Sequence, residues 1–126
     1  MNTQEAFDAA VKHLRKQGER SQARYSTDCL YRGPGGLKCA VGALIPDELY
    51  EKSYEGRAVK ILVYTAGNIG KLFRNVDINV LITLQNVHDS IPAEKWEHHF
   101  ACIAEKYGLT LTPSAEQQTR EDNQKT

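Results

Sequence analysis

Apolar side chains recur at helical spacing near the start of the chain. One narrow apolar stripe is formed by Phe7, Ala10, Val11 and Leu14. Because these positions fall three or four residues apart, they indicate one face of an amphipathic helix. Asn2 or Thr3 can accept hydrogen bonds from the first turn, and Gly18 stands where a left-handed C-cap usually lies. The pattern predicts a helix over residues 3–17.

The second half of the chain shows the same periodicity twice. Asp77 can cap a helix whose apolar face carries Val80, Leu81, Leu84, Val87 and His88. Pro92 suits the first position of a following helix, which Gly108 ends. The apolar face of this second helix carries Trp96, Phe100, Ile103, Ala104 and Tyr107. Because the connection is short, we predict a helical hairpin over about 77–108.

A glycine-rich turn separates two short extended stretches between these helical regions. The stretches 29–32 and 37–39 flank Gly33-Pro34-Gly35-Gly36, which predicts a β-hairpin over about 28–39 with Tyr31 opposite Lys38. The apolar runs 40–45 and 57–64 do not distinguish helix from strand, and we favour helix for both. Gly67 and Gly70 indicate a loose connection. The expected fold class is therefore α+β: a mostly helical single domain of three to five helices with one β-hairpin.

Composition places these elements in one domain. The chain has 126 residues, of which 40% are apolar and 25% charged, as in an ordinary globular domain. Residues 1–111 form the expected domain, and 112–126 contain almost nothing to bury, so we expect a disordered tail. No export signal begins the chain and no apolar run approaches the roughly 18 residues of a membrane span. We therefore expect a cytoplasmic protein without membrane contact.

The three cysteines are the first candidates for chemistry. In a two-residue turn register the Cys29 and Cys39 side chains point to opposite faces of the hairpin, whereas a bulged three-residue turn would bring them together. His98 and Cys102 stand four residues apart, away from the apolar stripe of their helix. No spacing supplies the four ligands of a structural zinc site. We expect free, mostly inert thiols, and no metal or cofactor.

His88 and Asp89 are the second candidates. His88 shares the apolar phase of its helix, which indicates a core histidine with one hydrogen bond. An acid adjacent in sequence points elsewhere around a helix, so we expect that Asp89 does not orient the imidazole. A nucleophilic pair of Cys29 or Cys39 with His88 stays an alternative, but it needs a third, orienting group.

The glycine turn and its flanks are the expected binding site. An aromatic ring and two cations beside a projecting turn suit recognition of a partner protein. The residues assigned to this site are Tyr31, Arg32, Gly33, Gly35, Gly36 and Lys38. The other interpretation is a solvated hairpin tip with a cross-strand contact.

A basic stretch over residues 12–24 offers a further alternative. It carries Lys12, Arg15, Lys16, Arg20 and Arg24 against one acid, Glu19. Such a stretch can contact nucleic acid. The formal net charge is zero, however, and no motif of a known nucleic-acid reader is present. Nucleic acid is therefore an unlikely partner.

Two motifs carry a resemblance to a known group of proteins. The first is Cys29-x-Tyr31-Arg32-Gly33, continued by Gly36-x-Lys38-Cys39-Ala40-Val41-Gly42-x-Leu44-Ile45-Pro46-Asp47. The second is Leu84-Gln85-x-x-His88-Asp89, with Trp96 further on. Together, over roughly residues 3–110, they resemble small uncharacterised proteins of tailed bacteriophages and prophages.

The resemblance implies a phage accessory protein that acts in the host bacterial cytoplasm. Such proteins often bind and redirect a host protein, including defence enzymes, so we expect a binding protein and perhaps a defence inhibitor. The alternatives are a small cysteine-dependent enzyme and a nucleic-acid binder that uses residues 12–24. A homodimer stays open.

Overall fold

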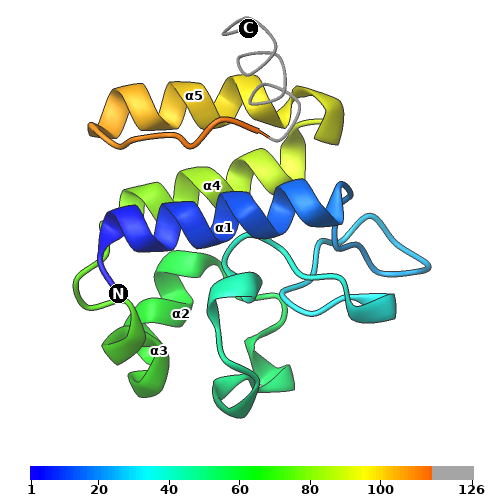
Figure 1. The fold of residues 1–126 in the computed structure, drawn as a ribbon. Helices are drawn as coiled ribbons and strands as arrows, with labels where there is room; N and C mark the ends of the chain where they lie inside the picture. Colours follow the sequence, from blue (N-terminus) through cyan, green and yellow to red (C-terminus); the bar gives the residue numbers. More distant parts are fainter. Residues whose placement is uncertain (115–126) are drawn as a thin grey trace, which may run out of the picture.

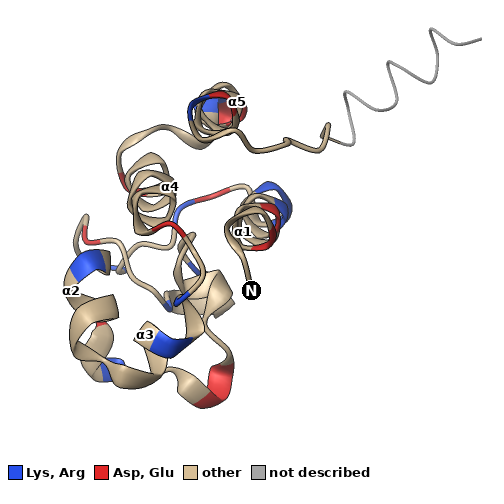
Figure 2. Cartoon of the chain, turned by 90° about the vertical axis from the view of Figure 1, so that its left-hand side faces the viewer, with Lys and Arg blue, Asp and Glu red and all other residues tan. Residues whose placement is uncertain are grey.

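Helix α4 (Ile78–Ser90) is the centre of the fold and packs against α1 (Thr3–Gln17), α2 (Val59–Thr65) and α5 (Trp96–Tyr107). The computed structural model describes residues 1–114. Figure 1 shows α1, α4 and α5 running alongside one another, and Figure 2 shows the same three helices nearly end-on. Helix α3 (Gly67–Leu72) packs against α2 on the other side of α4 from α5.

The predicted first helix is confirmed with its caps. The Asn2 side chain accepts the Glu5 N–H at 2.8 Å, and the Glu5 carboxylate accepts the Asn2 N–H at 2.9 Å. This reciprocal capping box satisfies two N–H groups that a helix start leaves unpaired. Gly18 ends the helix in the left-handed region at φ 70°. All four stripe residues are buried.

The predicted helical hairpin also forms. Asp77 caps α4 by accepting the Asn79 N–H at 2.9 Å, and Gly108 ends α5 at φ 66°. The five residues predicted for the apolar face of α4 are all buried. Pro92 precedes a 3-10 turn (Ala93–Lys95) instead of opening α5 directly.

The middle of the chain differs from the prediction in its local structure. The run 57–64 is mostly helical, as α2. The run 40–45 forms a turn and a 3-10 turn (Gly42–Leu44) instead of an α-helix. Gly67 and Gly70 lie inside α3, so the loose connection predicted there was wrong. Three further 3-10 turns are Pro34–Gly36, Asp47–Leu49 and Lys52–Tyr54.

The β-hairpin over 28–39, and with it the α+β class, was wrong: residues 1–114 are mostly helical and contain no strand. One isolated bridge joins Arg32 to Lys38, so Tyr31 does not face Lys38. One reason is that Leu30 pairs with the backbone of Ser21, to whose carbonyl it donates at 2.8 Å, and another is that side chains take backbone groups that a ladder would use. The Glu55 carboxylate accepts the N–H groups of Tyr31 and Arg32 at 2.8 and 3.1 Å. Gln17 accepts the Lys38 N–H at 2.9 Å and donates to the Lys38 carbonyl at 2.8 Å.

The 3-10 turn Gly42–Leu44 packs directly on the stretch that contains Tyr31. A Cβ atom placed on Gly42 would lie 2.1 Å from the Tyr31 carbonyl oxygen. That separation is far inside van der Waals contact, so only glycine permits this approach. The same turn also contacts α1.

Beyond α5 the chain returns toward α1. Gln4 exchanges two hydrogen bonds with the backbone of Thr110, and Arg15 donates to the Thr112 carbonyl at 2.7 Å. Of the tail predicted to be disordered, residues 115–126 lie outside the described residues. No helix among residues 1–114 has the length and apolar character that crossing a membrane requires.

Candidate functional site: a cleft beside helix α4

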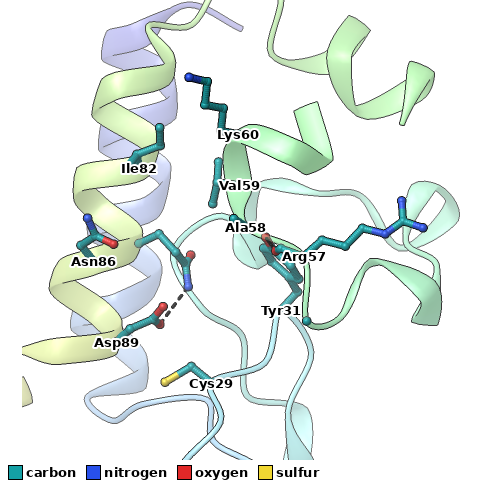
Figure 3. A pocket seen from close by; sticks show the side chains of 11 residues that line it. Cys29, Tyr31, Arg57, Ala58, Val59, Lys60, Ile82, Asn86 and Asp89 are labelled. Atoms are coloured by element: carbon teal, nitrogen blue, oxygen red, sulfur yellow. Dashed lines mark hydrogen bonds between the residues drawn. The ribbon is translucent and has the colours of Figure 1, made fainter. Parts of the chain in front are cut away.

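A cleft of about 420 Å³ opens between α4 and the start of α2 (Figure 3). Helix α4 contributes Ile82, Gln85, Asn86 and Asp89 to its lining. Residues 56–60 form the facing wall, and Cys29 and Tyr31 complete the lining. The cleft therefore brings together residues of three segments that are far apart in the sequence.

A hydrogen-bond network fixes the carboxylate at one end of this cleft. Asp89 Oδ1 accepts a hydrogen bond from His88 Nδ1 at 2.7 Å and another from Gln85 Nε2 at 2.9 Å. The expectation that Asp89 cannot orient its neighbouring imidazole was wrong. These residues lie at the end of α4, where the short Asp89 side chain reaches the His88 ring despite the angle between consecutive residues on a helix.

His88 is locked in one tautomer and orientation. The Ser21 N–H donates to His88 Nε2 at 3.0 Å, so Nε2 must carry the lone pair and Nδ1 the proton. The ring is fully buried and stacks on Trp96, with centroids 5.8 Å apart. Both ring nitrogens therefore have partners, which makes His88 a core histidine with two hydrogen bonds instead of the predicted one.

Gln85 holds Asp89 from the other side. Its Oε1 accepts the Val41 N–H at 3.2 Å while its Nε2 donates to Asp89. Through the motif Gln85-x-x-His88-Asp89, the Asp89 carboxylate is connected to Val41 by way of Gln85 and to Ser21 by way of His88. Gln85 was missed as a site residue, although its spacing of three and four residues from His88 and Asp89 places it on the same helix face.

The thiols of Cys29 and Cys39 are poor nucleophiles in this environment. Burial, and then the negative charge of Asp89 and a hydrogen bond to it, raises the pKa of Cys29 to about 11. Burial raises the pKa of Cys39 to about 12, although the Gly42 N–H, 3.3 Å from Sγ, acts in the opposite direction. The attacking species in cysteine chemistry is the thiolate, and both sites disfavour it.

The donor atoms of Cys29, His88 and Asp89 lie within 4.8 Å of one another. Their chemistry nevertheless fits a hydrogen-bond network better than a metal centre. A metal ligand must offer a lone pair, whereas His88 gives its only lone pair to the Ser21 N–H. Two remaining ligands do not make a closed site.

The residues predicted to bind a partner fall into two groups. Tyr31 and Arg32 have internal partners. The Tyr31 side chain is buried, with 6% exposure, and its hydroxyl donates to the Arg57 carbonyl at 2.6 Å. Arg32 contacts the Asp47 carboxylate, donates to the Ile45 carbonyl at 2.6 Å and lowers the pKa of Asp47.

The remaining turn residues are more accessible. Gly35 and Gly36 are exposed, both at positive φ, and the Lys38 ammonium lies 3.9 Å from Asp47. Gly33 is held close to Ser21, since a Cβ there would lie 2.4 Å from Ser21 Oγ. The binding role of this turn stays a prediction.

The other sequence candidates are dispersed. His98 and Cys102 approach to 3.7 Å on the exposed face of α5. In the basic stretch 12–24, Arg15 forms a bidentate pair with Glu97 and Arg20 donates to the His88 carbonyl at 3.1 Å. Figure 2 shows acidic as well as basic residues on α1, with Glu5 and Asp8 in its first half and the basic residues in its second half. The structure thus assigns part of the basic stretch to internal contacts.

Comparisons of the chain with protein families, with curated proteins and with solved structures find no match.

The environments of the thiols predict their order of reactivity. At pH 8, iodoacetamide is expected to alkylate exposed Cys102 first, while Cys29 and buried Cys39 react much more slowly. Peptide mass spectrometry after timed quenching measures each rate, and the guanidinium-unfolded protein, in which all three should react, is the control. The raised pKa of Cys29 also affects stability, because the folded state favours the protonated thiol. This contribution to the free energy of unfolding is fully present below about pH 9 and is lost as the pH rises toward 11. Alkylation of Cys29 as fast as that of Cys102 at pH 8 would contradict this assignment.

Proposed function

We propose that this protein is a non-enzymatic binding protein whose partner is a bacterial host protein. The observation that carries the proposal is the exposure of two large apolar side chains on α2. Ile61 is 52% exposed and Tyr64 is 73% exposed, on the helix that contributes Val59 and Lys60 to the cleft. Exposed aromatic and aliphatic groups beside a concavity are typical of recognition surfaces.

The chemistry of the cleft favours binding over catalysis. A cysteine enzyme needs a thiolate and a base with a free lone pair. The pKa of Cys29 is raised to about 11, and His88 has already given its lone pair to the Ser21 N–H. The cysteine-dependent alternative thus lacks both reacting groups in this arrangement.

The cellular setting is part of the proposal. The resemblance of the two motifs to phage and prophage proteins supports action in the bacterial cytoplasm, and inhibition of a host defence protein is one form that such binding takes. Two surfaces are candidates for binding the partner. One is α2 with Ile61 and Tyr64, and the other is the predicted turn with Gly35, Gly36 and Lys38.

Site-specific photo-crosslinking tests the proposal in bacterial cells that produce the protein. A benzophenone amino acid replaces Tyr64 on α2, Lys38 at the turn, or Tyr25 as a matched exposed tyrosine that is 97% exposed on a loop. We expect position 64 or position 38 to capture one host protein in a defined band that position 25 does not give. Equal capture from all three positions, or none from 64 and 38, would contradict a specific protein partner. A band that contains two copies of the chain would identify self-association instead.

A further inference from the structure

Two side chains that can bind a metal lie next to each other on the outer face of α5. His98 and Cys102 are both exposed and stand one helical turn apart, with His98 Nε2 at 3.7 Å from Cys102 Sγ. Two ligands of one tetrahedral zinc ion, bound through nitrogen at about 2.1 Å and through sulfur at about 2.3 Å, are separated by about 3.6 Å. The two donor atoms therefore already have the separation that a single zinc ion requires.

The fold leaves both of these donors available. Within residues 1–114, His98 Nε2 and the Cys102 thiol form a hydrogen-bond contact only with each other. His88 differs, because its lone pair is already given to the Ser21 N–H. Imidazole and thiolate together favour zinc over harder cations, and zinc takes a tetrahedral set of two nitrogens and two sulfurs. One chain supplies half of that set at this place.

The position of the two ligands around α5 is symmetric. Phe100, which is 1% exposed, marks the buried side of the helix. At 100° per residue, His98 and Cys102 lie about 20° to either side of the direction opposite Phe100. A second α5 packed antiparallel about a twofold axis at this point brings His98 opposite Cys102 of the second copy, and Cys102 opposite its His98. Two copies thus complete the four ligands.

The charges on the same face are complementary in this arrangement. In an antiparallel pair centred on residue 100, residues at equal distances before and after this position face each other. Lys95 then faces Glu105 of the second copy, and Glu94 faces Lys106. All four side chains are exposed, and none forms an ion pair within residues 1–114. A parallel pair would instead bring like charges together, so the order of charges selects antiparallel pairing with a second copy.

We propose that α5 carries half of a zinc site, and that one zinc ion joins two copies of the chain through His98 and Cys102 of each copy. Each imidazole donates its Nε2 lone pair, and each thiol releases its proton to water so that the thiolate sulfur binds. Four metal–ligand bonds form, nothing is oxidised or reduced, and the two thiolates balance the charge of the dication. The sequence expectation of no metal concerned the ligands of one chain, whereas this site needs two chains.

The inference does not depend on a host protein partner. Figure 2 shows α4 between α5 and the pair α2 and α3, so a pair joined through α5 leaves Ile61 and Tyr64 accessible. Failure of photo-crosslinking at positions 64 and 38 would therefore leave the zinc site unaffected. A chain that stays monomeric with zinc would equally leave the host partner unaffected.

Titration of the reduced full chain with zinc chloride tests the site. We expect light scattering after size-exclusion chromatography to change from the mass of one chain to that of two, complete at one zinc per two chains and reversed by EDTA. A phosphine reductant excludes a disulfide between two copies of Cys102. Cobalt(II) in place of zinc should give the absorption of a tetrahedral thiolate site. A monomer that binds zinc, no binding at micromolar zinc, or a dimer that persists in EDTA would each overturn the proposal.

Substitution of the ligands locates the zinc ion. His98→Ala and Cys102→Ser are each expected to weaken zinc binding at least about tenfold and to abolish the zinc-dependent dimer. His99→Ala is the matched control, because His99 is half-buried and lies about 100° further around the helix. Zinc should also slow alkylation of Cys102 by iodoacetamide without changing the rate at Cys29. A dimer that survives His98→Ala, or one that His99→Ala abolishes, would overturn the assignment; circular dichroism checks that each variant folds.

Charge reversal tests the antiparallel arrangement. Lys95→Glu brings like charges together at two places in the symmetric pair, so the zinc-dependent dimer should dissociate about tenfold more readily. The double variant Lys95→Glu with Glu105→Lys restores opposite charges and should restore the dimer. Lys12→Glu, at an exposed position on α1, is the control and should have no effect. A double variant as weak as Lys95→Glu alone would overturn the pairing of α5 with a second α5.

Discussion

Gly42→Ala is expected to lower the free energy of unfolding by about 3 kcal/mol or more, the upper part of the range for overpacking a core. The added methyl group would overlap the Tyr31 carbonyl oxygen, which a Cβ at this position meets at 2.1 Å. Backbone atoms cannot rotate away as a flexible side chain does. Relief would require the Gly42–Leu44 turn to move off the stretch beneath it. Urea unfolding followed by circular dichroism measures the change.

Gly67→Ala is the matched control for this substitution. Gly67 is exposed at the start of α3, and a Cβ there meets nothing within 4 Å. Alanine should leave stability unchanged or raise it by up to about 1 kcal/mol, because it reduces the entropy of the unfolded chain. Equal stability of the two variants would contradict this prediction, because it would show that the Gly42–Leu44 turn accepts a methyl group beside Tyr31 at no cost.

Glu55→Ala is expected to destabilise the protein by about 2–4 kcal/mol, because three part-buried donors lose their acceptor and a buried donor left without a partner costs about 1–3 kcal/mol. The Glu55 carboxylate accepts the N–H groups of Tyr31 and Arg32 and the hydroxyl of Tyr50, the last at 2.6 Å. Residues 1–114 contain no strand whose carbonyl groups could replace the carboxylate as the acceptor of these hydrogen bonds. Thermal and urea unfolding measure the loss.

Glu48→Ala provides the comparison for Glu55→Ala. Glu48 is an exposed acid in the 3-10 turn Asp47–Leu49, and its removal should change stability by no more than about 0.5 kcal/mol. A Glu55→Ala variant as stable as Glu48→Ala would mean that water replaces the carboxylate at little cost. The account of why 28–39 forms no hairpin would then lose its main support.

The sequence predicted α1, α4 and α5 well because their signals are local. Capping residues such as Asn2 and Asp77, and left-handed glycines such as Gly18 and Gly108, act within one turn of the helix they end. Apolar periodicity does the rest, since it shows directly which face is buried. These features need no information about distant parts of the chain.

The hairpin prediction failed because the structure of residues 28–39 depends on residues far away in the sequence. Glycine and proline correctly indicated a turn at 33–36, but Glu55 and Gln17 decide what the flanking N–H groups bind. The candidate site shows the same limit. That His88 and Asp89 act together depends on Ser21, 67 residues away, which fixes the tautomer of the ring.

Several side chains from distant parts of the sequence hold the stretch between α1 and α2, and this has a consequence for how the protein acquires its structure. The hydrogen bonds at Lys38, Tyr31 and Val41 link residues 21, 24 and 44 positions apart. Loop closure must precede each of them, whereas the three long helices form from local contacts. Each long helix is therefore expected to form early, before it packs on the others, whereas the cleft, whose lining includes Cys29 and Tyr31 of this stretch, is expected to form later.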